Sequence, residues 1–164
     1  MGLGQQLAVV ERVLFCHHDF AGMQMDGHID KLEKLARQFR AAIVEGDAEV
    51  LPVGLQDFPF GACQDAALLL AKYLGEQECG EFDYVLGQRE GHTHAWLQQG
   101  LVMVDVTADQ FEDYHGAVWV TVEHGWHSQF NGEVVGKADF EQYDAYTVAT
   151  LRAAYAEIVG RLRT

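Results

Sequence analysis

The chain has 164 residues, of which 49% are hydrophobic and 22% are charged, an ordinary balance for a single globular domain over residues 1–164. Its net charge of −14 repels phosphate backbones and anionic lipid surfaces, so we expect no nucleic-acid and no membrane partner. Three cysteines are too few for a disulfide framework, and neither a signal peptide nor a membrane span is evident, so we expect a cytoplasmic protein with free thiols.

The first half of the chain is predicted to be helical. Residues 5–15 suit a short helix, and the stretch DFAGMQMDG after them is expected to be a break. Residues 28–45 form an amphipathic helix, because apolar side chains recur there at helical spacing. Residues 63–74 form a second helix with almost no polar face, which indicates a helix buried on several sides.

The second half changes to short β-rich runs at residues 82–86, 92–97, 101–106 and 117–122. The stretch QQG between the second and third runs predicts a hairpin. A closing helix is expected over about residues 139–163. Helices first, then antiparallel strands, then a helix indicate an α+β fold rather than alternating βαβ units.

Cys63 lies in the first turn of the predicted helix 63–74. The unpaired N–H groups of a helix N-terminus favour a thiolate, which is the form of cysteine that attacks a carbonyl. The alternative is a small buried side chain, where free cysteines are usually found. Cys16 and Cys79 have no comparable setting and are interpreted as structural.

His94 and Asp105 lie on the two strands of the predicted hairpin. Counting from a turn centred near Gln99-Gly100, His94 pairs with roughly residue 105, and directly opposed residues have Cβ atoms about 5 Å apart. A carboxylate in the apolar run LVMVDV also needs a partner. We therefore expect Asp105 to orient His94, the base that takes the thiol proton. A purely structural Asp–His pair is the alternative.

Three stretches in this order, FPFGACQDAALLLAKYL, HAWL and VDVTADQF, resemble the transglutaminase-like branch of the papain-like fold over about residues 54–111. The resemblance implies a central helix bearing Cys63, packed on an antiparallel sheet bearing His94 and Asp105. These residues match the nucleophile, the general base and the orienting carboxylate. Bacterial cysteine peptidases that process leader peptides in lasso-peptide pathways are one similar group, and bacterial proteins of unknown role with the same stretches look closer still.

Gln56 lies seven residues before Cys63, and papain-like enzymes often place a glutamine upstream as an oxyanion-hole donor. A plain surface position is the alternative. Asp109 is a second candidate for the third triad member, although it fits better as the cap of a turn. His92 is on the same strand face as His94, which leaves open a zinc site with Cys63. We expect no metal and no cofactor.

These residues predict a cysteine-dependent acyl-transfer enzyme that acts on an amide bond through a thioester. A triad alone does not separate peptidase, deamidase and transglutaminase. The acidic chain favours a basic peptide or protein substrate. The alternative is a non-catalytic peptide- or protein-binding module on the same fold. Residues 123–138, rich in glycine and aromatic residues, are a candidate cover for the cleft.

Overall fold

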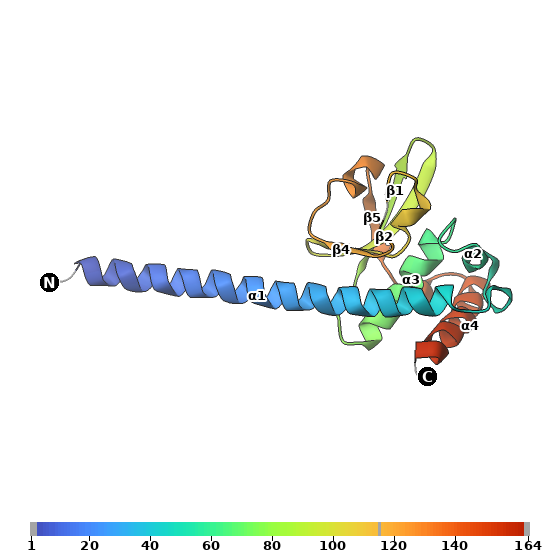
Figure 1. Ribbon diagram of the computed structural model, residues 1–164, viewed down its shortest axis with the longest axis horizontal. Helices are drawn as coiled ribbons and strands as arrows, with labels where there is room; N and C mark the ends of the chain where they lie inside the picture. The colour runs from blue at the N-terminus through green and yellow to red at the C-terminus, as the bar shows by residue number, and fades with distance from the viewer. Residues whose placement is uncertain (1–2, 115, 163–164) are drawn as a thin grey trace.

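A computed structural model describes the backbone of residues 3–114 and 116–162, and the side chains of residues 24–114 and 116–162. Helices pack around a five-stranded antiparallel sheet in the order β4-β3-β2-β1-β5 (Figure 1). The α+β class predicted from the order of elements is confirmed.

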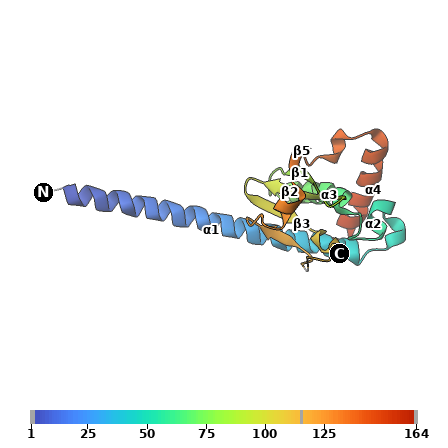
Figure 2. The ribbon, with the colours of Figure 1, turned by 90° about the horizontal axis from the view of Figure 1, so that it is seen from above.

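Helix α1 spans Leu3–Val44 without interruption, whereas the sequence predicted two helices with a break between them. The glycines of the expected break, Gly22 and Gly27, each cost a helix only about 1 kcal/mol, and no proline is present to remove a backbone hydrogen bond. Figures 1 and 2 show that the N-terminal half of α1 extends beyond the other elements. The C-terminal half carries the predicted apolar stripe, buried at Leu32, Ala36, Phe39, Ala42 and Ile43.

A short helical turn η1 (Ala48–Val50) and helix α2 (Val53–Gln56) lead to helix α3, Cys63–Glu76. Helix α3 begins at the predicted residue and runs two residues past the predicted end. Gly61 has a φ of 67°, a left-handed conformation that glycine adopts without strain, and it turns the chain into α3. The predicted burial of this helix is confirmed on most of its sides.

The strands are β1 (Asp83–Arg89), β2 (His92–Gln99), β3 (Val102–Asp105), β4 (Trp119–Thr121) and β5 (Glu133–Lys137). The first four match the predicted runs. Strand β5 lies in the segment predicted as a loop, and all five of its residues are exposed. The usual alternation of apolar and polar residues is therefore missing, and only the pairing with β1 makes this edge segment a strand.

The hairpin of β2 and β3 is offset from its predicted register. Gln99 lies opposite Val102, so the turn is centred one residue later than predicted. Continuing this register places Asp105 opposite Trp96 rather than opposite His94, and the predicted direct pairing is wrong. Because strand side chains alternate with a period of two, this shift of two residues leaves His94 and Asp105 on the same face.

The two faces of the sheet pack against different neighbours. One face joins α1, α3 and α4 (Ala145–Leu162) in the main core, through Ala95, Leu97, Val102 and Val104 of the central hairpin. The other face carries a smaller cluster of Val85, Trp96, Met103 and Phe130. The short turn η3 (His127–Phe130) supplies Phe130 to that cluster, so part of the predicted covering segment packs on this face.

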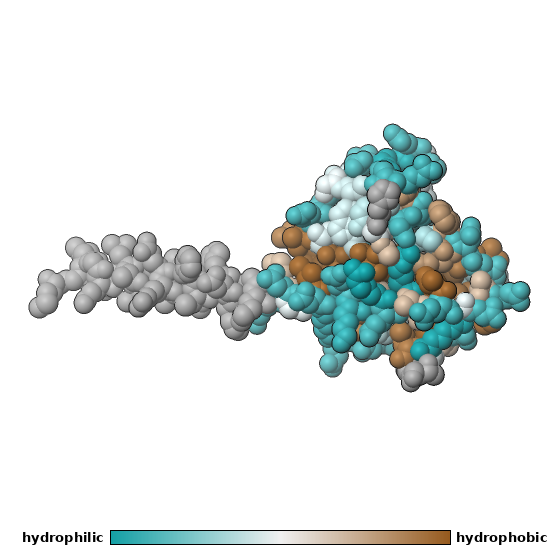
Figure 3. All heavy atoms as spheres, viewed as in Figure 1, coloured by the Kyte–Doolittle hydropathy of each residue, from teal (hydrophilic) through white to brown (hydrophobic). Residues whose placement is uncertain are grey.

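Two further turns complete the chain. Turn η2 (Ala108–Gln110) follows β3, and turn η4 (Phe140–Gln142) precedes α4, where one closing helix was predicted from residue 139. Figure 3 shows a visible face that is hydrophilic over much of its area, with apolar patches between. Within the described part of the chain, no helix combines the length and apolar character that crossing a membrane requires.

Candidate active site

Cys63 is the first residue of α3, and the helix N-cap, Ala62, offers no capping side chain. The backbone N–H groups of the first turn therefore have no cap to satisfy them and remain available to a negative charge. The thiol is 5% exposed. A thiolate at this point is stabilised by the helix N-terminus on one side and by any acid–base partner on the other.

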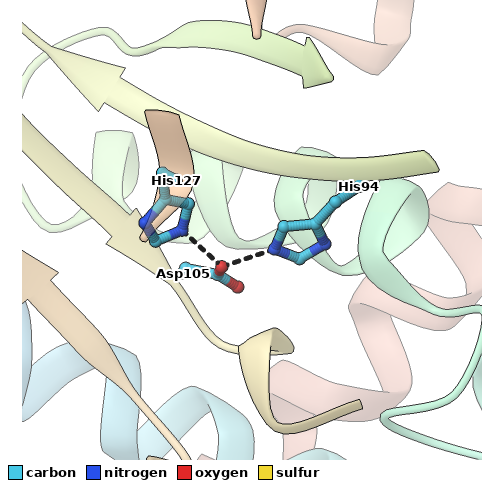
Figure 4. A group of neighbouring side chains, drawn as sticks. All are labelled: His94, Asp105 and His127. Atoms are coloured by element: carbon cyan, nitrogen blue, oxygen red, sulfur yellow. Dashed lines mark hydrogen bonds and ion pairs between the residues drawn. The ribbon is translucent and has the colours of Figure 1, made fainter. Parts of the chain in front are cut away.

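His94 provides that partner. Its Nε2–H donates to Asp105 Oδ2 over 2.6 Å, and both side chains are buried, at 0% and 2% exposed (Figure 4). Asp105 is held independently at its other oxygen, where Oδ1 accepts from the Thr107 backbone N–H at 2.8 Å and from the Thr107 hydroxyl at 3.2 Å. The carboxylate is thus fixed from two sides, and it fixes the imidazole in turn.

Gln110 identifies the protonated nitrogen of His94. The Gln110 amide nitrogen donates to the Thr107 carbonyl at 3.0 Å, which orients the amide, and it also lies 3.2 Å from His94 Nδ1. Since Nε2–H donates to Asp105, Nδ1 is the acceptor in this pair. The Cys63 thiol also lies close enough to the imidazole to contribute to the raised pKa of His94. Nδ1 is therefore the ring nitrogen that does not bind Asp105, and it takes up the thiol proton by giving up the hydrogen bond from Gln110.

The charges of the site support an ionised pair. Burial lowers the pKa of His94, but the Asp105 charge and hydrogen bond, with smaller contributions from Cys63, outweigh it and raise this pKa to about 9. Burial raises the pKa of Asp105, yet the two neighbouring imidazoles hold it well below its usual range. At neutral pH the arrangement favours a carboxylate at Asp105 beside an imidazolium at His94.

His127 is a residue of the site that the sequence did not reveal. It belongs to η3, is 1% exposed, and donates from Nε2 to the same Asp105 Oδ2 at 2.8 Å (Figure 4). Its sequence context, GWHSQF, has no spacing that relates it to either strand of the hairpin. Only the fold of the segment over the sheet brings it to Asp105.

Aromatic rings enclose the pair of imidazoles. Trp96 lies 5.6 Å from His94 between ring centroids. Phe111 and Trp126 meet His94 edge to face at 5.1 and 5.8 Å. These rings exclude water from the Asp105–His94 hydrogen bond, and an electrostatic interaction is stronger in such an environment than in water.

Two candidates from the sequence, Gln56 and Asp109, are placed away from this group. Gln56 is exposed, and its amide donates to the Leu51 carbonyl at 2.9 Å instead of pointing at the thiol. Asp109 forms a bidentate ion pair with Arg40, at 2.9 and 2.7 Å, so it does not replace Asp105. It does not cap η2 either, because the N-cap of that turn is Thr107. The structure therefore does not bring Gln56 or Asp109 to His94, and the oxyanion role of Gln56 stays a prediction without a supporting contact.

The alternative zinc set of Cys63, His92 and His94 is not assembled either, because His92 is exposed and packs edge to face with Phe111. A different group, His94, Asp105 and His127, has potential ligand atoms within 4.8 Å of one another. Around a tetrahedral zinc ion, ligand atoms are about 3.3 Å apart, longer than the 2.6 and 2.8 Å found here. Moreover, His127 Nδ1 lacks the partner that metal-bound histidines usually have. The group fits hydrogen bonding and not a metal site.

A hollow of about 690 Å³ lies beside the site. Gln110, which contacts His94, forms part of its wall, and so do Phe60 from the turn before α3 and Glu90 from the turn after β1.

Comparisons with protein-family models, with curated proteins and with solved structures found no match to this chain. The class that the fold and the site define is thus an α+β protein with a buried cysteine, histidine and aspartate in contact.

Proposed function

We propose that the chain is a cysteine-dependent acyl-transfer enzyme that acts on amide bonds, on a transglutaminase-like or papain-like fold. The observation that supports this most is the orientation of His94. Its Nε2–H is committed to Asp105, so Nδ1 is left to Cys63 and Gln110. A purely structural Asp–His pair has no need of a thiol at the other nitrogen, on the first residue of a helix.

The reaction begins when His94 Nδ1 accepts the proton of Cys63 and the sulfur attacks the carbonyl carbon of an amide. Asp105 stabilises the imidazolium through Nε2–H. The negative oxygen that develops is met by the Cys63 backbone N–H and the neighbouring first-turn amides of α3, which take the place predicted for Gln56. Return of the proton from Nδ1 to the leaving nitrogen releases an amine and leaves a thioester on Cys63.

Water or an amine then resolves the thioester. Attack by water, with His94 as the base, restores the thiol and yields an acid, which corresponds to a peptidase or a deamidase. Attack by a lysine amine yields a new amide, which corresponds to a transglutaminase. All three share the chemistry of one acyl-enzyme, and the substrate groove decides between them.

The proposed substrate is a peptide or protein with basic side chains, met in the cytoplasm. The net charge of −14 attracts such a chain, and Glu90 and Glu112 lie on the wall of the hollow beside Gln110. Phe60 offers an apolar surface in the same wall. Cys63 is only 5% exposed, so the side chains that cover it must move when a substrate reaches the sulfur.

The low exposure of Cys63 favours a second candidate function, that of a peptide-binding module in which the thiol is not used. The two functions differ in whether a covalent intermediate forms. The protein should be mixed with fluorogenic peptide amides that carry either basic or acidic side chains, quenched in acid, and examined by mass spectrometry for acyl-Cys63. Fluorescence anisotropy would measure binding of the same peptides.

The enzyme proposal expects an acyl group on Cys63 and release of the fluorophore, faster for basic peptides. His94→Ala should reduce the rate by about 10³-fold or more. Cys79→Ala is a matched control, since this thiol is buried and its one described hydrogen bond is to the Gln77 carbonyl at 3.7 Å. Peptide binding without any acyl-Cys63 or turnover would establish the binding module instead.

A further inference from the structure

We propose that His127 is a positioning residue for the Cys63–His94 pair: its Nε2–H shares the Asp105 carboxylate with His94 and so weakens the hold of Asp105 on the His94 proton. This inference rests on the proposed function, because it assigns His127 a role in proton transfer at that site. His127 does not line the hollow, and its described hydrogen bond is to Asp105, through which it acts.

The Asp105 carboxylate has every one of its acceptor positions occupied. Oδ2 accepts from the two imidazoles, at 2.6 Å from His94 and 2.8 Å from His127. Oδ1 accepts twice from Thr107. A carboxylate offers about four lone-pair positions, so each donor takes a share of one charge. Without His127, the oxygen bound to His94 would carry more of that charge.

The orphaned nitrogen of His127 indicates its protonation. Nδ1 is buried and has no hydrogen-bond partner among the described residues. A doubly protonated ring would bury an unpaired N–H donor there, which is costly, whereas a bare nitrogen is less so. His127 therefore acts as a neutral donor, and it withdraws charge from Asp105 without adding a positive charge beside His94.

The ring of His127 is fixed by its surroundings. Trp96, Trp119 and Trp126 surround it at centroid distances of 4.8, 4.8 and 5.0 Å. Among the described residues, the ionisable groups that interact with the paired imidazoles are Asp105 from β3 and Cys63 from α3. Outside the aromatic layer, Arg89 lies over the rings of Trp126 and Phe130 at 5.4 and 4.5 Å. His127 is thus held as a donor to one acceptor.

The shared carboxylate has a consequence for catalysis. His94 must first take a proton from Cys63 and then release it to the leaving amine. A carboxylate bound to His94 alone favours the imidazolium more strongly and makes it a weaker acid for the second step. Because His127 takes part of the Asp105 carboxylate charge, Asp105 still orients His94 but does not hold the proton of the imidazolium too strongly.

Two substitutions separate this role from packing. His127→Gln places an amide N–H near the position of Nε2 but removes the ring, whereas His127→Phe keeps a ring and removes the donor. The measurement is the rate of Cys63 alkylation by iodoacetamide against pH, with mass spectrometry at Cys63, and with the fold of each variant checked by circular dichroism. In His127→Phe the alkaline inflection, where His94 loses its proton, should rise by about half a pH unit or more, while His127→Gln should stay near the wild type.

A His127→Phe profile that overlays the wild type overturns the inference, as does a larger change in His127→Gln than in His127→Phe, which is the order that packing alone predicts. If Cys63 of the wild-type protein reacts no faster than a free thiol at acid pH, the proposed function itself has failed, which is a different outcome. A second measurement needs no variant: long-range ¹H–¹⁵N spectra of the histidines should show His127 protonated at Nε2 and bare at Nδ1. A proton at Nδ1 contradicts the inference.

Discussion

His94 and Asp105 are joined by a 2.6 Å hydrogen bond although the register of their strands sets them two residues apart from direct opposition. Diagonal neighbours on one face have Cα atoms about 7–8 Å apart, which long polar side chains bridge. Trp96 takes the position opposite Asp105 and packs against His94. The offset thereby places an aromatic ring against the His94 imidazole while the hydrogen bond is kept.

Replacing Asp105 by Asn should reduce acyl transfer by about 10²- to 10⁴-fold. The amide has no charge to stabilise the His94 imidazolium, and its NH₂ group cannot accept from either imidazole. The reduction should appear in kcat, measured by release of fluorophore from a peptide amide. An activity within a factor of two of the wild type would show that His94 needs no orienting charge.

Stability should depend on pH through the same pair. The pKa of His94 is raised to about 9, so its contribution is complete below its ordinary pKa of 6.5 and is lost as the pH rises through about 9. The pKa of Asp105 is lowered, so its contribution is complete above its ordinary value of 3.8 and is lost as the pH falls below it. Urea unfolding at pH 5.5 should therefore give a larger free energy of unfolding than at pH 9.5, by up to the order of 3 kcal/mol.

The control for that comparison is Asp105→Asn, because repulsion among the many acidic residues also grows with pH. The variant keeps this background but lacks the carboxylate that raises the pKa of His94. The difference between pH 5.5 and pH 9.5 should shrink in the variant. Equal differences in both proteins would mean that the buried pair does not contribute.

A methyl group at Gly132 should destabilise the cover over the site. A Cβ placed there would lie 2.4 Å from Trp96 Cη2, closer than side chains approach one another. We expect Gly132→Ala to cost about 1–3 kcal/mol in urea unfolding and to slow Cys63 acylation. Gly125→Ala is the matched control in the same segment, because a Cβ at Gly125 meets nothing within 4 Å. Similar losses in both variants would contradict the close packing of Trp96.

The Arg40 guanidinium connects α1 to the turn that carries Thr107 and Gln110. It binds the Asp109 carboxylate through both nitrogens and also donates to the Val106 carbonyl. Arg40→Met should loosen this turn, cost about 1–3 kcal/mol in unfolding and reduce Cys63 reactivity. Arg37→Met, which breaks an exposed pair with Glu33 on the same helix, should cost less than about 1 kcal/mol and leave reactivity unchanged. Equal effects of the two substitutions on unfolding and on Cys63 reactivity would contradict a coupling between α1 and the site through Arg40.

The sequence was sufficient for the elements with clear periodicity. The apolar run after Cys63 predicted a buried helix, and the runs around His94 and Asp105 predicted neighbouring strands, both of which are found. The turn of their hairpin was misplaced by one residue, yet the shared face survived because the error moved the pairing by two. Their catalytic roles remain predictions.

Features that depend on contacts distant in sequence could not be predicted. His127 reaches Asp105 from a segment without helical or strand periodicity, across 22 residues of chain. Gln56 was assigned from its place before Cys63, but its amide satisfies a carbonyl within its own turn. Residues 22–27 contain two glycines, and the helix continues through them because nothing blocks its backbone hydrogen bonds.

The most direct test of the central claim, a Cys63–His94 ion pair, is the rate of Cys63 alkylation by iodoacetamide at pH 6, read by mass spectrometry at that residue. The wild-type thiol should react at least about tenfold faster than free cysteine, since an ordinary thiol with a pKa near 8.5 is almost fully protonated at this pH. His94→Ala should reduce the rate to that of an ordinary thiol. A wild-type rate no higher than that of free cysteine, and no higher than that of His94→Ala, would contradict the ion pair and with it the proposed enzyme.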